Sequence, residues 1–144
     1  MNKDFEKCLK NKRIVEQDYA KNLVSGELES ANFDLSRAVK NFDEQDNKWA
    51  TIQAYYSIFH ASRALLFLKG YREKSHYCLK TSIQALFVDK GIFDQKYVDD
   101  FDTTMLLRET ADYKNDFSKE RAETAIENAK EFLEKAKEII GSSQ

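Results

Sequence analysis

The sequence predicts an all-α protein, an up-and-down antiparallel bundle of five to six helices. Proline is absent from the 144 residues and there are only four glycines, so the residues that punctuate β-hairpins and long loops are nearly missing. Charged residues make up 33% of the chain and hydrophobic residues 42%, a balance typical of amphipathic helices around an apolar centre. Apolar residues also recur at helical spacing along most of the chain.

The first two helices are expected in the N-terminal third of the chain. Over residues 4–12, Phe5, Cys8 and Leu9 fall at helical spacing and predict a short helix. A longer helix is expected over 18–43, where charged residues occupy one face and apolar residues the other. The apolar stripe of this second helix consists of Leu28, Ala31, Leu35, Ala38, Val39 and Phe42.

The segment 49–68 is predicted to be the central helix of the bundle. It is apolar almost all round and Arg63 is its only formally charged residue, so it should be buried on most sides. Its length approaches that of a membrane span, but Gln53, His60 and Ser62 lie inside it and its neighbours are highly charged. We therefore expect a helix within a bundle and no membrane partner.

Glycine and serine set the expected bounds of the next helix. Gly70 is placed to end the central helix, and 71–75 is expected to form a turn. Ser75 is suited to cap a helix over 75–89, which Gly91 then ends.

Two further helices complete the predicted bundle. One is expected over 94–113, and Ser118 is suited to cap the last helix, over 118–140. The final residues, 141–144, are expected to form a loose tail. At this length the chain suits a single domain, which we place over 1–140.

Charge and cysteine content restrict the class of protein. The net charge of -2 argues against a sequence-independent DNA-coating protein, which needs a surplus of Lys and Arg. Cys8 and Cys78 lie far apart without Cys-x-x-Cys spacing, so the sequence predicts reduced thiols and neither a disulfide nor a zinc site. Residues 1–12 lack the continuous apolar run of a signal peptide, and we expect a cytoplasmic protein.

Three strings of the sequence carry a family resemblance. They are AYYSIFHASRALL at 54–66, GYREKSH at 70–76 and LRETADY at 107–113. In this order they resemble the HEPN family, the higher eukaryote and prokaryote nucleotide-binding domains, and particularly its small prokaryotic branch. With their helical surroundings the strings cover nearly the whole chain.

The resemblance implies an assembly and an activity. It implies a helical bundle that pairs into a homodimer and is encoded beside a minimal nucleotidyltransferase, in a toxin and antitoxin arrangement. Many family members are metal-independent ribonucleases, whose motif is an Arg followed after four to six residues by a His at the dimer cleft. Arg108 matches that Arg, but Tyr113 stands five residues further on, and no His follows His76.

This departure changes the chemistry that we expect. A ribonuclease without a metal needs a group that titrates near neutrality to take the 2'-hydroxyl proton, and His is suited to that role. The phenol of Tyr113 is a poor base at pH 7, and Arg108 would hold a neighbouring carboxylate such as that of Asp112 in its ionised, weakly basic form. Arg108, Tyr113 and Asp112 are therefore candidate catalytic residues only if the protein is an enzyme.

A line of polar residues marks the central helix. Tyr56, His60 and Arg63 are spaced at i, i+4 and i+7 and so lie on one side of it. They form either a buried hydrogen-bonded network or the wall of a cleft. A core histidine bonded to a neighbour is the simpler interpretation of His60. Arg63 should meet a carboxylate or face a cleft, because a guanidinium is rarely left unpaired inside a protein.

The basic turn, Arg72, Lys74, Ser75 and His76, is the candidate phosphate-binding site. Helix N-termini attract anions, and basic residues beside them strengthen the attraction. If the protein binds a phosphate, we expect it to bind at this turn. The alternative is a solvated turn, because short clusters of charge are common on helical proteins.

These observations lead to one preferred function and two alternatives. The preferred function is a HEPN-like dimeric binding protein, partner of a minimal nucleotidyltransferase in a toxin-antitoxin-type module, which binds a nucleotide or an RNA phosphate. The alternatives are a metal-independent RNA endonuclease that uses Arg108 and Tyr113, and a purely structural dimer module. No Gly-rich phosphate loop, paired metal ligands or acid pair indicates another enzyme class, so we expect no metal and no cofactor.

Overall fold

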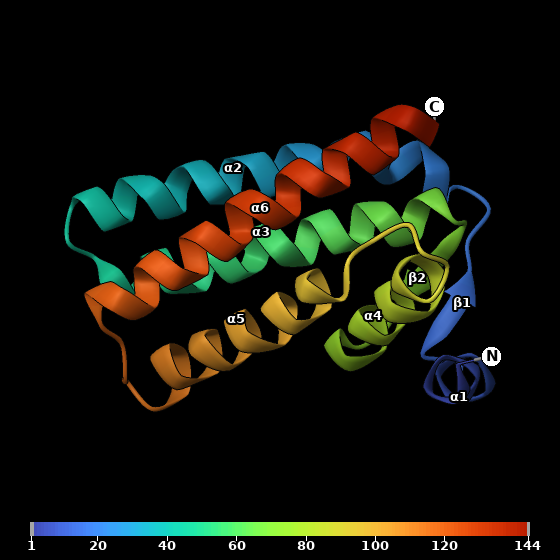
Figure 1. Ribbon diagram of the computed structural model, residues 1–144, viewed down its shortest axis with the longest axis horizontal. Coiled ribbons are helices and arrows are strands. Elements are labelled where there is room, and N and C mark those ends of the chain that lie inside the picture. Colours follow the sequence, from blue (N-terminus) through green and yellow to red (C-terminus); the bar gives the residue numbers. More distant parts are fainter. Residues whose placement is uncertain (1, 144) are drawn as a thin grey trace.

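The chain folds into long helices that run side by side, with a small antiparallel sheet at one end (Figure 1). The computed structural model describes residues 2–143. In chain order the elements are α1 (Lys3–Lys10), β1 (Ile14–Glu16), the 3-10 turn η1 (Ala20–Leu23), α2 (Val24–Asp43), α3 (Asn47–Leu68), β2 (Tyr71–Glu73), α4 (His76–Ile83), the π-helical turn η2 (Gln84–Val88), α5 (Gln95–Tyr113) and α6 (Lys119–Ser143). The predicted all-α fold class is confirmed.

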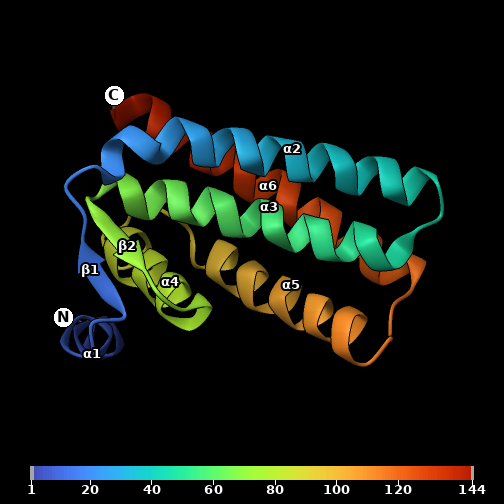
Figure 2. The same cartoon turned by 180° about the vertical axis from the view of Figure 1, so that it is seen from behind.

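Helix α3 is the centre of the bundle. It lies between α2 and α6 on one side and α4 and α5 on the other (Figures 1 and 2). Alanines that are fully buried on α3 and α2 let these two helices approach closely. The hydroxyl of Ser57 donates a hydrogen bond of 2.9 Å to the carbonyl of Ala31 across this contact. None of the described helices is long and apolar enough to cross a membrane.

A two-stranded sheet replaces the turn predicted over 71–75. Strand β2 pairs antiparallel with β1, and Val15 lies opposite Arg72. The backbone N–H of Lys74 continues this pairing with a hydrogen bond of 2.8 Å to the carbonyl of Arg13. The prediction of a turn was wrong because each strand has only three residues, too few to show an alternating pattern, and the partner strand is far away in sequence.

A disulfide joins Cys8 of α1 to Cys78 of α4, with a Cα–Cα distance of 5.9 Å. The prediction of two reduced, unpaired thiols was therefore wrong. The pairing of β1 with β2 folds the N-terminal segment back onto α4 and brings together two residues 70 positions apart in sequence. Local cysteine spacing contains no signal of such a contact.

The helix boundaries follow the predicted caps in most places. The hydroxyl oxygens of Ser75 and Ser118 accept hydrogen bonds of 3.1 Å from backbone N–H groups in the first turns of α4 and α6. Gly70 and Gly91 take positive φ angles of 83° and 76° just past helical segments. The second helix is shorter than predicted, because residues 20–23 form η1 and α2 begins at Val24.

The last helix is longer than predicted. Helix α6 runs through Gly141, where a loose tail was expected, as far as Ser143. Ile139 and Ile140 are buried and anchor its last turns, while one glycine costs a helix only about 1 kcal/mol. Residue 144 lies outside the described residues.

Candidate functional site

An aromatic strip on α3 connects most of the predicted site residues. We use this name for Tyr55, Tyr56, Phe59 and Phe67. Tyr55 and Phe59 are four residues apart and lie on the same side of the helix, and Arg63 covers both Phe59 and Phe67 further along it. The ring of Tyr56 meets the rings of Tyr55 and Phe59 edge-on, at centroid distances of 5.3 and 5.9 Å.

Arg108 reaches from α5 to one end of the aromatic strip. Its Nη2 donates a hydrogen bond of 3.0 Å to the hydroxyl of Tyr56. Its Cζ lies 5.7 Å from the ring centroid of Tyr55 and 5.4 Å from that of Tyr56, distances typical of cation–π contacts. Tyr113 adds a third ring at 5.5 Å. The guanidinium thus stands among three aromatic rings.

The charge of Arg108 is only loosely matched by a carboxylate. Asp112 Oδ2 lies 3.6 Å from Arg108 Nη2, beyond hydrogen-bond distance. Arg108 Nε is buried and has no hydrogen-bond partner among residues 2–143. The structure therefore brings Arg108, Asp112 and Tyr113 together, and it leaves donor capacity on the guanidinium. Tyr113 is 73% exposed.

His76 lies on the aromatic strip beside Arg108. Its ring stacks on Phe59 at 4.6 Å and on Tyr55 at 5.7 Å, and the Tyr55 hydroxyl forms a hydrogen bond with His76 Nδ1. Burial lowers the pKa of His76, and the nearby charge of Arg108 lowers it further. The imidazole is therefore neutral at pH 7.

The tautomer of His76 follows from its partner. Burial raises the pKa of Tyr55 far above its ordinary value, so the phenol keeps its proton. The Tyr55 hydroxyl has no other hydrogen-bond partner among the described residues, so it donates to His76 Nδ1. A neutral imidazole that accepts at Nδ1 carries its proton on Nε2. His76 thus presents a hydrogen-bond donor.

His60 and Arg63 belong to a partly buried network of charged groups. Arg63 lies 3.3 Å from Glu27 and donates from Nε to Glu73 at 3.1 Å, while His60 Nδ1 lies 2.6 Å from Glu27. Asp34 is 3.6 Å from the other ring nitrogen of His60. Arg63 thus has carboxylate partners, and it also borders a surface hollow. Burial raises the pKa values of Asp34 and Glu73, while His60 opposes the rise at Asp34 and Arg63 opposes it at Glu73.

Arg72 and His76 of the basic turn contact two different parts of the aromatic strip. The guanidinium of Arg72 lies 5.8 Å from the ring centroid of Phe67, the ring that Arg63 also covers at 5.2 Å. A surface hollow of about 480 Å³ adjoins both arginines at the start of α2. Ser75 uses its hydroxyl oxygen as the cap of α4, and Lys74 is exposed. His76 lies apart from this group, nearer Arg108.

Sequence reasoning missed the residues that hold the site together. The apolar character of the helix predicted that its rings are buried, and Tyr55 and Phe67 are core residues at 0% and 1% exposure. What the sequence did not indicate is that these rings also contact the site residues. No sequence signal indicated Glu27 and Glu73 as partners of Arg63, because they come from other elements.

Comparison with known proteins identifies the class of helical bundle that carries this site. A family model described as the HEPN domain matches residues 25–139, and the chain belongs to this family, as the three strings predicted. Two relatives come from Methanocaldococcus jannaschii. "Putative toxin MJ0605" is 31% identical over 135 residues, 93% of this chain and 96% of the relative. "Putative toxin MJ0142" is 25% identical over 130 residues, 89% and 88% of the two chains.

Proposed function

We propose that this HEPN protein is one component of a toxin-antitoxin-type module, in which it forms a homodimer and binds the phosphate of a nucleotide or RNA at Arg108. The names of the two relatives support the toxin role. The family resemblance supports the dimer, and a minimal nucleotidyltransferase as the partner protein. The observation that carries the proposal is the Arg108 guanidinium, held among three aromatic rings, with the Asp112 carboxylate 3.6 Å away and beyond hydrogen-bond distance.

The chemistry of Arg108 suits a phosphate. A guanidinium presents donors in a planar fork that matches two phosphate oxygens, and Tyr56 takes one close hydrogen bond from it. The surrounding rings exclude water on one side, which strengthens attraction to an anion. His76 Nε2–H, on the neighbouring part of the strip, supplies a further donor to the same ligand.

Uncovered apolar side chains on α5 support the homodimer. Leu106 is 60% exposed and Tyr113 73% exposed, and residues seven apart lie on the same side of a helix. Pairing would cover both side chains, and Tyr113 lies beside Arg108. Light scattering should give twice the 16.8 kDa mass of the chain. A mass near that of one chain at high micromolar concentration contradicts the dimer.

A binding experiment tests the phosphate site. Labelled single-stranded RNA is titrated into the wild type, Arg108→Ala and the double variant Arg72→Ala/Lys74→Ala, each at two salt concentrations. We expect affinity to fall as salt rises, and to fall about tenfold or more in Arg108→Ala, since a hydrogen bond to a charged group contributes about 1.5–3 kcal/mol. A loss of affinity in the double variant alone would place the phosphate site at the basic turn instead.

Two further outcomes of this titration are decisive. Equal affinity in all three proteins shows that neither cluster binds phosphate. No binding in any of them favours the purely structural dimer module. The partner is tested separately: a minimal nucleotidyltransferase encoded beside this chain should co-elute with it, and separate elution at micromolar concentrations contradicts the pairing.

A second candidate function is a metal-independent RNA endonuclease, and the position of His76 favours it. The family motif lacks its His at Tyr113, but the neutral imidazole of His76 lies on the strip near Arg108. As a base it would have to accept a proton at Nδ1, which the Tyr55 hydroxyl occupies. For this reason we prefer binding to cleavage.

Cleavage assays in the presence of a chelator separate the two functions. The binding proposal predicts no RNA cleavage above that of Arg108→Ala. Cleavage by the wild type that disappears in both Arg108→Ala and His76→Asn would establish the enzyme. Tyr113→His restores the family residue, and activity gained there would show that the rest of the cleft is intact.

A further inference from the structure

The N-terminal segment lies outside the residues that match the family model. That match begins at residue 25, whereas α1 and β1 precede it and pack against α4 and β2 (Figures 1 and 2). The disulfide between Cys8 and Cys78 cross-links this segment to α4 of the bundle.

Helix α1 has little to hold it in place besides the disulfide. It has eight residues, fewer than an isolated helix needs for stability in water, and Cys8 is its one buried residue. Phe5 and Leu9 are half-buried and pack against the edge of the core, and Phe5 meets Tyr71 edge-on at 6.0 Å. An exposed hydrogen bond of 3.2 Å joins Asn2 to Asp89.

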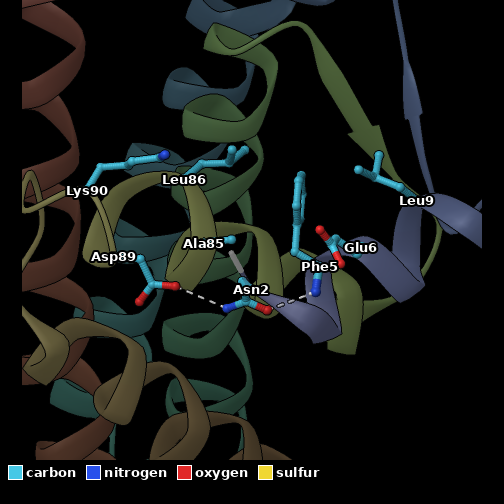
Figure 3. A pocket seen from close by; sticks show the side chains of 8 residues that line it. All are labelled: Asn2, Phe5, Glu6, Leu9, Ala85, Leu86, Asp89 and Lys90. Atoms are coloured by element: carbon cyan, nitrogen blue, oxygen red, sulfur yellow. Dashed lines mark hydrogen bonds between the residues drawn. The ribbon is translucent and has the colours of Figure 1, made fainter.

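A pocket of about 490 Å³ separates α1 from η2 (Figure 3). Phe5 and Leu9 of α1 line one side, and Ala85 and Leu86 line the other. The inner face of α1 is thus incompletely packed, and apolar contact alone fixes it weakly.

From these observations we propose that Cys8 and Cys78 form a reversible thiol–disulfide site that latches α1 onto α4. A low-molecular-weight thiol opens the latch and a low-molecular-weight disulfide closes it. In the open form α1 leaves the bundle and exposes the apolar wall of the pocket.

The exchange proceeds in two balanced steps. A thiolate attacks one sulfur of the Cys8–Cys78 bond, forms a mixed disulfide and releases the other cysteine as a thiolate, which takes up a proton. A second thiol then attacks the mixed disulfide and releases the second cysteine. The protein gains two thiols, and the two small thiols leave as one disulfide. Because Cys8 and Cys78 are only 4% and 5% exposed, attack requires α1 to open transiently.

The rest of the bundle does not depend on this bond. Helix α4 is anchored by Leu79 and Ile83, both fully buried, and Ser75 caps it without help from the disulfide. Strand β1 stays paired with β2, and Ile14 is buried at 1% exposure. Opening should therefore stay within residues 2–11.

Hydrogen exchange read by mass spectrometry tests the latch. The wild type is compared with and without dithiothreitol, beside a Cys8→Ser/Cys78→Ser variant. We expect amides of α1 to exchange about tenfold faster or more after reduction, while those of α3 and α6 keep their rates. The variant should behave as the reduced form in both conditions.

Three results overturn the latch. The first is equal exchange of the α1 amides in both redox states. The second is loss of protection throughout the protein on reduction, which would mean that the bond stabilises the whole fold. If the variant does not fold, alkylation of the reduced wild type decides. If both cysteines are alkylated faster than the amides of α3 exchange, the latch is supported. If they are alkylated no faster than those amides exchange, the latch is overturned.

Discussion

Replacing Arg63 with methionine should destabilise the protein in a pH-dependent way. The guanidinium lies between Glu27 and Glu73, at 3.3 and 3.1 Å, and the side chains of Arg63 and Glu73 are 16% and 8% exposed. Methionine has a similar length and can cover Phe59 as Arg63 does, so Arg63→Met removes the charge with little loss of packing.

The magnitude follows from the carboxylates left behind. Removing one partner of a buried ion pair costs about 3–5 kcal/mol, and partial exposure of Arg63 places the expected loss near 3 kcal/mol at pH 7. For a chain of this length that loss lowers Tm by about 10 °C.

The pH dependence has a definite sign. Burial raises the pKa of Glu73 and Arg63 opposes that rise, so Arg63→Met raises it further. A carboxyl with a raised pKa binds more protons in the folded state than in the unfolded state. Stability is then lost as pH rises from the ordinary value of 4.5 through the raised pKa of Glu73. The variant should be closer to the wild type at pH 5 than at pH 7.

Thermal unfolding followed by circular dichroism at pH 5 and pH 7 measures this effect. Adding Glu73→Gln to Arg63→Met should recover part of the loss at pH 7. Lys96→Met is the matched control, because Lys96 pairs with Asp100 and Glu131 but is 46% exposed, and its loss should stay below about 1 kcal/mol. A loss in Arg63→Met no greater than in the control, or equal at both pH values, refutes the reasoning.

Three further predictions concern the elements around the site. Reduction of the Cys8–Cys78 bond should release α1 and leave the rest of the bundle folded, so the free energy of unfolding in urea titrations should fall by about 1 kcal/mol or less, and a loss near about 4 kcal/mol contradicts this. Burial lowers the pKa of His76, so the folded state binds fewer protons than the unfolded state, and stability should rise with pH from that lowered pKa to about 6.5. His76→Asn should flatten this rise in melting curves, and an unaltered slope would exclude His76 as its source. Ser75→Ala removes the cap of α4 and should cost about 1 kcal/mol, with a smaller loss showing that the cap contributes little.

Most of the fold could be predicted because its signals are local. The apolar character of 49–68 predicted α3 as the buried centre, and Ser75 and Ser118 predicted the starts of α4 and α6. The sheet and the disulfide could not be predicted, because both depend on the N-terminal segment meeting residues about 60 to 70 positions away. Sequence spacing reports neighbours along an element and contains little information about contacts between distant elements.

The candidate site shows the same division. Arg108, Asp112 and Tyr113 were expected together and lie together, since they share one helix. The sequence placed His76 in one group with Arg72 and Lys74. In the structure its ring instead stacks on Tyr55 and Phe59. The direction of a side chain at a helix start depends on what packs beside it.

The Nε–Hε signals of the arginines in a nuclear magnetic resonance titration with short single-stranded RNA test the central proposal most directly. Arg108→Lys assigns the Arg108 signal by its disappearance. We expect this signal to shift as RNA is added and the shift to diminish at higher salt, while the signal of Arg37, on α2, stays fixed. An Arg108 signal that remains still while that of Arg72 moves would contradict the account, and so would a titration in which no arginine signal moves.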